Sequence, residues 1–174
     1  MKPYILKDVK GKGKGIFATR DIKAGEQILH LDLNKLKSYS RKEINENPKL
    51  QSNHCDYYGH SRYVIDHSPA SYMNHSCDPN CITKHKSIKV KDVYALKDIK
   101  KGEELTHDYA AGAIDQINAK NSWKLRCKCG SKNCRKEVTG NFFKLPVELQ
   151  RKYYPYLPPS IKAKYKDRFK RLKR

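Results

Sequence analysis

The chain has 174 residues and a formal net charge of +20, from 38 lysines and arginines against 18 aspartates and glutamates. This length suits a single domain with its own core, and the positive charge favours a polyanion such as nucleic acid as a neighbour. No stretch approaches the roughly 20 apolar residues that cross a bilayer, and the start lacks the apolar run of a secretory signal, so we expect an intracellular protein without membrane contact.

Short strands are expected first, because runs of β-branched, aliphatic and aromatic residues alternate with glycine turns. These runs lie at residues 4–6, 15–18 and 27–31. Ser40 and Glu43 have the spacing of a capping box, which predicts a short helix that Pro48 ends. A hairpin is expected over residues 54–66, and a further strand is expected over residues 88–96.

The composition shifts after Gly140, where lysines and arginines outnumber the acids. Pro146 is expected in the first turn of one helix, and Pro158 and Pro159 are expected to cap a second helix. In that second helix, apolar residues recur with helical spacing at Ile161, Tyr165, Phe169 and Leu172. We expect this stripe to pack on the domain, while the basic face is either a solvated surface or a contact with nucleic acid or substrate.

The chain contains six cysteines, which in a reducing compartment indicate metal ligands rather than disulfides. Three of them fall within residues 127–134 with a spacing that suits a tetrahedral zinc site, but they supply only three of its four ligands. Segment 74–81 offers a fourth, so we expect the C-terminal part to fold back onto it. Buried thiols without metal are the alternative, which fits Cys55 and Cys81.

Glycines alternate with lysines over residues 11–15. This run lacks the spacing of a phosphate-binding loop, so we do not expect a nucleotide phosphate there. A hairpin turn and a close approach of the backbone to a ligand are the two alternatives.

Four motifs follow one another in one order along the chain. They are Lys12 to Ala18, Tyr72 to Asn80, Gly102 to Tyr109 and the cysteine triplet. In this combination, residues 3–140 resemble the SET-domain protein lysine methyltransferases that carry a post-SET zinc motif. The resemblance is weaker over residues 141–174.

The resemblance implies a mainly β fold with short helices, the β-clip fold of SET domains. In that fold the segment around Asn74 and His75 and the segment ending at Tyr109 cross as a pseudoknot. The resemblance implies a SET catalytic domain over residues 1–112 and a post-SET zinc-binding lid over residues 113–143. Residues 144–174 would then form a basic helical C-terminal extension.

The resemblance also implies an S-adenosylmethionine-dependent protein-lysine N-methyltransferase with one structural zinc ion. The residues implied to bind S-adenosylmethionine are Lys12, Gly13, Lys14, Gly15, Tyr72, Asn74, His75 and Tyr109, with Phe142 and Phe143 as an aromatic cover. The implied catalytic residues are Tyr109, His107 and Tyr58, with Tyr57 and Tyr63 as alternatives to Tyr58 for lining the lysine channel. The implied zinc ligands are Cys77, Cys127, Cys129 and Cys134.

The chain departs from the family pattern at two places. Ser71, Tyr72 and Met73 stand where many members have an Arg-Phe sequence before the Asn-His pair, so a guanidinium contact is absent. His107 stands where the family usually has Phe or Tyr, at a position that helps set the number of methyl groups added. A histidine there either holds a water beside the amine and limits methylation, or is simply tolerated.

Methyl transfer from a sulfonium to a neutral amine needs alignment and exclusion of water more than an acid-base triad. A chain of this charge should repel a free lysine-rich peptide. Either acidic residues make the cleft locally negative, or the substrate is met on DNA or RNA that neutralises both partners, which we favour. We therefore expect a histone, chromatin or ribosomal protein as substrate, and nucleic acid on the basic C-terminal helix.

The expected location is the nucleus or chromatin of a eukaryote, or the cytoplasm or nucleoid of a prokaryote. A non-catalytic, zinc-stabilised module that binds nucleic acid or chromatin is the alternative function. An enzyme whose main target is itself is an intermediate hypothesis. Tyr109 with Asn74 and His75 favours catalysis, because a pure binding module has no chemical need for them.

Overall fold

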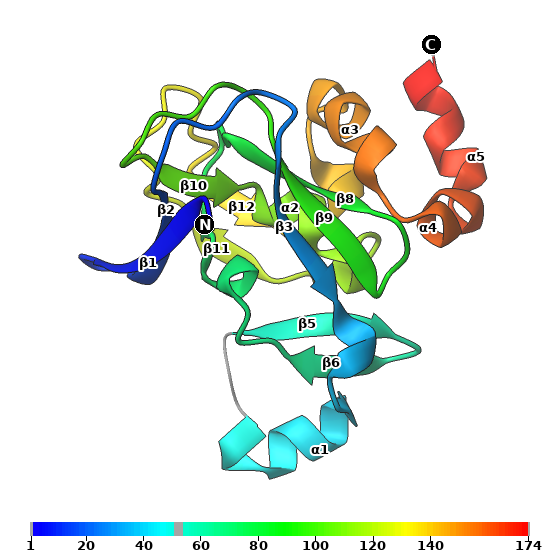
Figure 1. The fold of residues 1–174 in the computed structure, drawn as a ribbon. Coiled ribbons are helices and arrows are strands. Elements are labelled where there is room, and N and C mark those ends of the chain that lie inside the picture. The colour runs from blue at the N-terminus through cyan, green and yellow to red at the C-terminus, as the bar shows by residue number, and fades with distance from the viewer. Residues whose placement is uncertain (1, 51–53, 174) are drawn as a thin grey trace.

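The computed structural model describes residues 2–50 and 54–173, and its strands form several small sheets (Figure 1). The first sheet has the order β1-β2-β10-β7, formed by Tyr4–Val9, Gly13–Ala18, Glu104–His107 and Asn74–His75. The second sheet has the order β3-β9-β8, formed by Gln27–Asp32, Val90–Ala95 and Cys81–His85. The third sheet has the order β4-β6-β5, formed by Ser38–Ser40, Arg62–Ile65 and Cys55–Gly59. Lys124–Arg126 and Glu137–Thr139 pair as β11 and β12.

The helices are short. The α-helices are α1 (Arg41–Glu46), α2 (Tyr109–Gly112), α3 (Val147–Tyr153), α4 (Pro159–Lys164) and α5 (Lys166–Phe169). The 3-10 helices are η1 (Leu33–Lys35), η2 (Pro48–Leu50), η3 (Pro69–Tyr72), η4 (Ile114–Gln116), η5 (Phe142–Lys144), η6 (Tyr154–Tyr156) and η7 (Lys170–Lys173). The predicted mainly β fold with short helices is confirmed. Within the described residues, no helix has the length and apolar character to span a membrane.

The glycine run over residues 11–15 is a hairpin turn between β1 and β2. The two strands pair antiparallel from Tyr4 opposite Ala18 to Val9 opposite Gly13. Gly11 has a φ of 75° and Gly13 a φ of 73°, a left-handed backbone that side chains with a Cβ rarely adopt. The turn that the sequence offered as one alternative is therefore present, and its glycines allow it.

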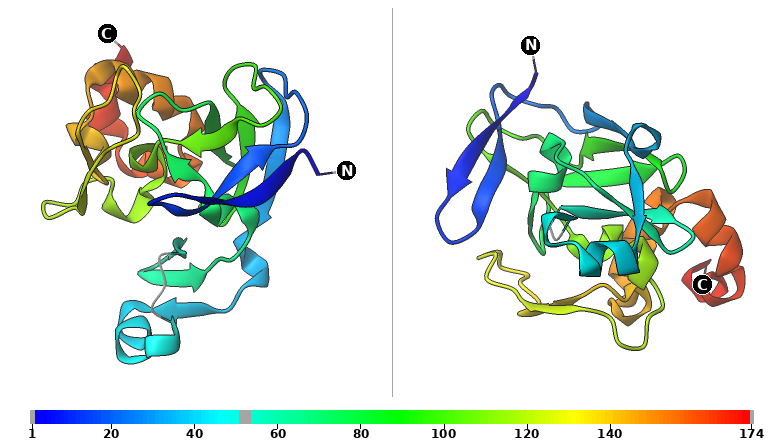
Figure 2. Two further views of the ribbon diagram at one scale, coloured as in Figure 1. Left: turned by 90° about the vertical axis from the view of Figure 1, so that its left-hand side faces the viewer. Right: turned by 90° about the horizontal axis from the view of Figure 1, so that it is seen from below.

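The third sheet and α1 form a lobe that extends from the body, clearest in the left view of Figure 2. The predicted capping box begins α1. The Ser40 backbone N–H donates to Glu43 Oε2 at 2.7 Å, and the Glu43 N–H donates to Ser40 Oγ at 3.2 Å. Two helix-terminal donors are thereby satisfied, a stabilisation of about 1 kcal/mol. The lobe matters because it forms one wall of the cavity described below.

Two hydrophobic clusters hold the body together. The first lies among the strands and includes the fully buried Ile16, Ile99 and Leu105. The second joins residues from the middle of the chain, the cysteine segment and the C-terminal helices, including Ala110, Val138 and Phe142. The C-terminal helices therefore share a core with the cysteine segment.

The C-terminal region agrees with the expectations from sequence only in part. α4 begins at Pro159, as predicted, while Pro146 is the N-cap of α3 rather than part of its first turn. Ile161 and Phe169 of the predicted stripe are buried on the domain, and Tyr165 and Leu172 are partly buried against the same cluster. The expectation of one continuous helix is wrong, because Tyr165, with φ −110° and ψ 26°, separates α4 from α5. This break brings the Tyr165 and Phe169 rings to 5.6 and 5.1 Å from the ring of Phe143.

Candidate active site and zinc cluster

A short parallel pairing at the centre of the molecule joins two segments that are far apart in sequence. Asn74 pairs with Thr106, and His75 pairs with His107. β7 has only two residues, too few for any strand pattern to be recognised in sequence. The pairing sets these two segments side by side, as the expected crossing requires, and directs both toward one cavity.

This cavity has a volume of about 810 Å³ and lies between the lobe, the β1-β2 turn, the second sheet and the segment after α2. The predicted site residues that line it are Lys12, Gly13, Lys14, Tyr72, Asn74, His107 and Tyr109. The predicted site residues that do not line it are Gly15, Tyr58, His75, Phe142 and Phe143. Gly15 and His75 do not line the cavity themselves, but each lies next to a residue that does. Gly15 packs closely against Asn74, and His75 accepts a hydrogen bond from Tyr109.

Gly15 fixes the position of Asn74. The Asn74 carboxamide donates to the Lys14 carbonyl oxygen at 3.2 Å and to Glu104 Oε1 at 2.7 Å. A Cβ on Gly15 would lie 2.7 Å from Glu104 Oε1 and 3.0 Å from the Asn74 nitrogen, closer than carbon atoms approach. The absent side chain therefore lets β2 come close to Asn74, which is the close backbone approach that the sequence offered as the other alternative for this run.

His75 connects the cavity wall to the cysteine cluster. The backbone N–H of Tyr109 donates to His75 Nδ1 at 3.2 Å, and His75 Nε2 lies 3.3 Å from the Sγ of Cys77. Because Nδ1 accepts a hydrogen bond, the ring proton lies on Nε2 and points at the sulfur. Burial lowers the pKa of His75, which keeps this neutral tautomer in place.

The four predicted zinc ligands lie together. The Sγ atoms of Cys77, Cys127, Cys129 and Cys134 are all within 4.8 Å of one another. The Sγ atoms of Cys77 and Cys127 are 3.7 Å apart. Tetrahedral zinc-thiolate bonds of about 2.3 Å give sulfur separations of about 3.8 Å, so this arrangement fits zinc. The Arg135 backbone N–H at 3.4 Å from the Cys77 Sγ is suited to a thiolate.

A buried ion pair lies beneath the same region. Arg135 donates to both oxygens of Asp108, at 2.6 and 2.7 Å, and the Tyr153 hydroxyl donates to Asp108 Oδ2 at 3.0 Å. Although burial opposes it, the Arg135 guanidinium holds the pKa of the Asp108 carboxyl below its usual range. The residue before Tyr109 is thus tied to the cysteine segment and to α3.

The lobe hairpin presents Tyr57 to the cavity and not Tyr58, the residue chosen from sequence. Adjacent residues on a strand point to opposite faces, and the Tyr58 ring instead meets the Lys89 ammonium at 3.9 Å. The Tyr57 ring lies edge-on to Tyr63, with centroids 5.7 Å apart. Of the three candidate tyrosines, only Tyr57 lines the cavity.

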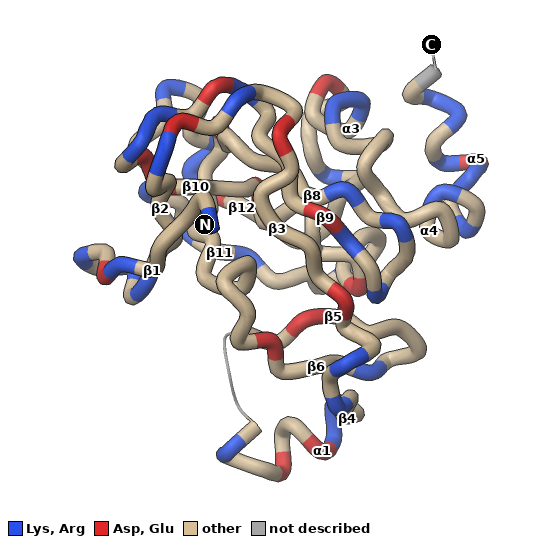
Figure 3. Tube along the Cα trace, in the orientation of Figure 1, with Lys and Arg blue, Asp and Glu red and all other residues tan. Residues whose placement is uncertain are grey.

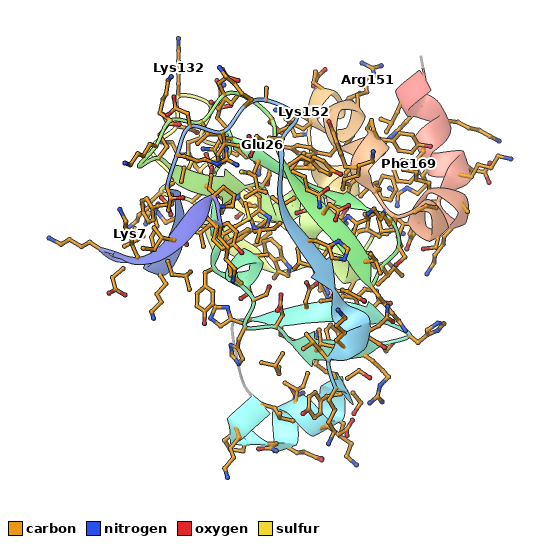
Figure 4. The ribbon with its side chains drawn as sticks, in the orientation of Figure 1. Lys7, Glu26, Lys132, Arg151, Lys152 and Phe169 are labelled. Atoms are coloured by element: carbon orange, nitrogen blue, oxygen red, sulfur yellow. The ribbon has the colours of Figure 1, made fainter. Side chains whose placement is uncertain are left out.

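The predicted aromatic cover also differs from the structure. Phe142 and Phe143 are buried in the C-terminal cluster, with exposed fractions of 1% and 9%, and both rings contact Phe169. Figure 4 labels Phe169 among the C-terminal helices. The apolar surfaces of Phe142 and Phe143 are therefore covered by the C-terminal helices rather than by a ligand. The aromatic residue close in sequence to the cysteine triplet that lines the cavity is Trp123.

The sequence does not single out Trp123 as an aromatic cover, because it precedes the cysteines, whereas the predicted cover follows them. Its side chain packs on Gly140, where a Cβ would lie 2.7 Å from the indole nitrogen. Asp56 and Asp66, two of the acids that the sequence offered for a locally negative cleft, line the cavity, and so does Asp115, which the sequence does not single out. Their carboxylates give part of its wall negative charge in an otherwise basic chain.

His107 and Tyr109 share the inner wall of the cavity, with ring centroids 5.1 Å apart and edge-on geometry. Burial lowers the pKa of His107 to about 4 and raises the pKa of the Tyr109 hydroxyl. Both side chains are therefore neutral near pH 7. These two side chains can therefore donate and accept hydrogen bonds without presenting a charge of their own to a bound group.

The chain is similar to known proteins over most of this region. The profile of the SET domain matches residues 13–110. The histone-lysine N-methyltransferase trithorax of Drosophila virilis is 33% identical over 135 residues, covering 71% of this chain and 3% of that protein. Human histone-lysine N-methyltransferase 2B is 30% identical over 132 residues, covering 71% of this chain and 5% of that protein.

A fungal relative matches a shorter segment. The histone-lysine N-methyltransferase, H3 lysine-9 specific KMT1, of Fusarium mangiferae is 40% identical over 78 residues, covering 39% of this chain and 23% of that protein. The chain therefore spans only a small part of the relatives it matches.

Proposed function

The chain belongs to the SET domain family, and from that premise we propose that it transfers a methyl group from S-adenosylmethionine to a lysine side chain of a protein. The observation that carries the proposal is the single cavity lined by Lys12, Gly13, Asn74, His107 and Tyr109. Its volume of about 810 Å³ is within the range of small-molecule sites, and it leaves room for a second group beside the donor.

The residues present fit S-adenosylmethionine. The β1-β2 turn places Gly13 and Lys14 at the cavity, and Gly15 lets the following strand pack closely against Asn74, which also lines it. Lys12 and Lys14 offer ammonium groups to a carboxylate. Trp123 offers an aromatic face to a flat ring. S-adenosylmethionine, when bound, supplies an electrophilic methyl group on a sulfonium.

The chain's own residues would align the acceptor amine and exclude water. A lysine ammonium has no lone pair, and an apolar wall lowers its pKa by desolvation. The Tyr109 hydroxyl would orient the neutral amine by a hydrogen bond, and the rings of Tyr57 and Tyr109 would face the alkyl stem and any cationic methylammonium. The step requires no charged acid or base from the wall, which agrees with a neutral His107.

His107 would also limit the number of methyl groups. A neutral imidazole on the cavity wall can hold a water molecule by hydrogen bonding, and that water occupies space that a methylated amine would need. We therefore propose that the enzyme adds fewer methyl groups than its His107→Phe variant.

The zinc ion would act through structure. Cys77 contacts His75, and His75 accepts the backbone hydrogen bond of Tyr109. Zinc on the four cysteines would fix this chain of contacts and the segment that carries Trp123. Its function would be to hold the donor site closed.

The substrate proposed is a lysine-containing protein of chromatin, such as a histone, or a ribosomal protein. The relatives' printed names support histones. The site of action would be chromatin in a eukaryote or the nucleoid in a prokaryote. Lysines and arginines on α4 and α5, seen in Figure 3, would contact the nucleic acid that carries the substrate.

A panel of acceptors tests the function. The zinc-loaded chain would be incubated with labelled S-adenosylmethionine and with core histones, nucleosomes, ribosomal proteins or no acceptor. Label on lysine in at least one acceptor supports the proposal, and label in the chain alone identifies self-methylation. Absence of label everywhere, with the donor bound, would overturn catalysis in favour of a binding module.

A further inference from the structure

A second hollow lies on the surface beside the cysteine cluster, separate from the cavity of the candidate active site. It has a volume of about 470 Å³. Its lining consists of Arg126, Cys127, Lys128, Gly130, Ser131, Cys134 and Lys136. It contains no aliphatic or aromatic side chain and no carboxylate. We propose that this hollow binds the phosphate backbone of a nucleic acid, at a site distinct from the C-terminal helices.

The cations that line the hollow are available to a ligand. Arg126, Lys128 and Lys136 are exposed, and they form no ion pair within the part of the chain that the structure describes. Glu137, which stands opposite Arg126 in the β11-β12 pairing, forms its ion pair with Lys124 at 2.8 Å. Free cations gathered at a concave surface attract a polyanion.

The negative charge of a zinc-thiolate cluster would offset only part of the positive charge at this hollow. Zinc on four thiolates carries a net negative charge, which neighbouring cations offset. Lys132 adds to the three lining cations from the same loop, and its side chain extends away from the body in Figure 4. The cations together exceed the charge of the cluster, so the hollow keeps a positive field.

Lys136 gives an independent reason to assign a function here. Its φ of 63° lies in the left-handed region, where a lysine is strained. The Cys127 N–H donates to the Lys136 carbonyl oxygen at 2.7 Å and holds this conformation. Glycine would relieve the strain, but it would remove the cation from the hollow. The lysine therefore places a cation at the hollow that glycine, the residue this backbone conformation favours, would not supply.

Nucleic acid is the polyanion that these features fit best. Duplex DNA offers one phosphate per about 1.7 Å of axis, so several adjacent cations can each meet a phosphate. A membrane surface site would pair its cations with exposed apolar side chains, and the lining of this hollow has none. This inference does not depend on methyl transfer, because phosphate binding involves neither the donor nor the active-site cavity.

The test measures binding of the full chain, loaded with zinc, to a fluorescent duplex DNA by anisotropy over a range of salt concentrations. The test variants are Arg126→Gln/Lys128→Gln and Lys136→Gly, the second of which keeps the left-handed turn. The matched control is Lys42→Gln/Lys49→Gln, which removes the same charge from exposed positions on the lobe. Zinc content and the far-ultraviolet spectrum are recorded for each protein.

Each lost phosphate contact lowers the slope of log affinity against log salt by about 0.9. We expect a slope lower by about two for the double variant and by about one for Lys136→Gly, with the control near wild type. An equally large loss of slope in the control would show that the effect depends only on net charge, and it would overturn the proposed site. So would unchanged slopes in both test variants, no DNA binding by the wild type, or tighter binding to phosphatidylserine vesicles than to DNA.

Discussion

The backbone N–H of Tyr109 donates to Nδ1 of His75 at 3.2 Å, and the opposite nitrogen of the same ring faces the Cys77 sulfur. One imidazole therefore contacts both a cavity residue and a zinc ligand. It cannot reverse its tautomer without losing both contacts. Metal binding at the cysteine cluster would therefore be coupled to the shape of the cavity through this ring.

Loss of zinc should weaken donor binding before the body unfolds. Cys129→Ser should bind little zinc and should bind S-adenosylmethionine at least tenfold more weakly, since disturbing the surroundings of a metal site costs about 10- to 100-fold. The measurement is calorimetry of donor binding, with circular dichroism to follow folding. Cys81→Ala is the control, because burial raises the pKa of that thiol to about 12 and it lies outside the cluster. Normal donor affinity in zinc-free Cys129→Ser would contradict the coupling.

Gly15→Ala should weaken donor binding by about tenfold. The new Cβ would crowd Glu104 Oε1 and the Asn74 nitrogen. The hydrogen bond between them would be disturbed, and Asn74 would shift from its position in the cavity wall. Calorimetry would compare this variant with Glu104→Ala and with the double variant. Because the closest atom belongs to Glu104, the double variant should recover part of the affinity. A Gly15→Ala protein with wild-type affinity would show that the close approach is not needed.

Some parts of the structure could be predicted from the sequence and others could not. The strands, the Ser40 capping box and the cysteine triplet follow from local patterns, whereas Cys77 as the fourth thiol is implied by the family resemblance; the structure confirms the capping box and brings the four thiols together. β7 is too short to carry a pattern, and its parallel partner lies more than 30 positions away in sequence. Which tyrosine faces the cavity depends on strand register, so Tyr57 could not be distinguished from Tyr58.

The C-terminal aromatic residues illustrate another limit of sequence. Phe142 and Phe143 are apolar enough for either a ligand cover or a core. The decision depends on whether the later helices reach them, and Phe169 does. Trp123 carries no motif of its own, and only the fold places it on the cavity.

Tyr153→Phe should lower the free energy of unfolding by about 2 kcal/mol, because the buried Asp108 carboxylate loses a hydroxyl donor. Tyr154→Phe is the matched control, since Tyr154 is only partly buried and its hydroxyl forms no hydrogen bond within the described residues. Urea unfolding measures both. Equal stabilities for the two variants would mean that the link between Asp108 and α3 adds nothing.

Stability should fall as the pH is lowered below about 6.5. Burial lowers the pKa of His85 to about 4, whereas an unfolded chain has a histidine pKa of about 6.5. Between pH 6.5 and about pH 4, the unfolded state binds a proton at His85 that the folded state does not bind. For each unit by which the pH is lowered, the contribution of His85 to the free energy of unfolding therefore falls by about 1 kcal/mol. His85→Gln should show a correspondingly smaller slope in urea unfolding from pH 6 to pH 5. Equal slopes for the wild type and His85→Gln would show that His85 is not the source of the pH dependence.

Methyl transfer is proposed to take place in the cavity that Tyr109 and Tyr57 both line. The direct measurement is the initial rate of label transfer from S-adenosylmethionine to the best acceptor, for wild type, Tyr109→Phe, Tyr57→Phe and Tyr58→Phe, all loaded with zinc. We predict a rate at least about 100-fold lower for Tyr109→Phe, because the hydroxyl that orients the amine is lost. We predict a rate close to wild type for Tyr57→Phe, which keeps the ring that faces the alkyl stem, and a wild-type rate for Tyr58→Phe. Transfer by Tyr109→Phe at the wild-type rate would contradict this assignment.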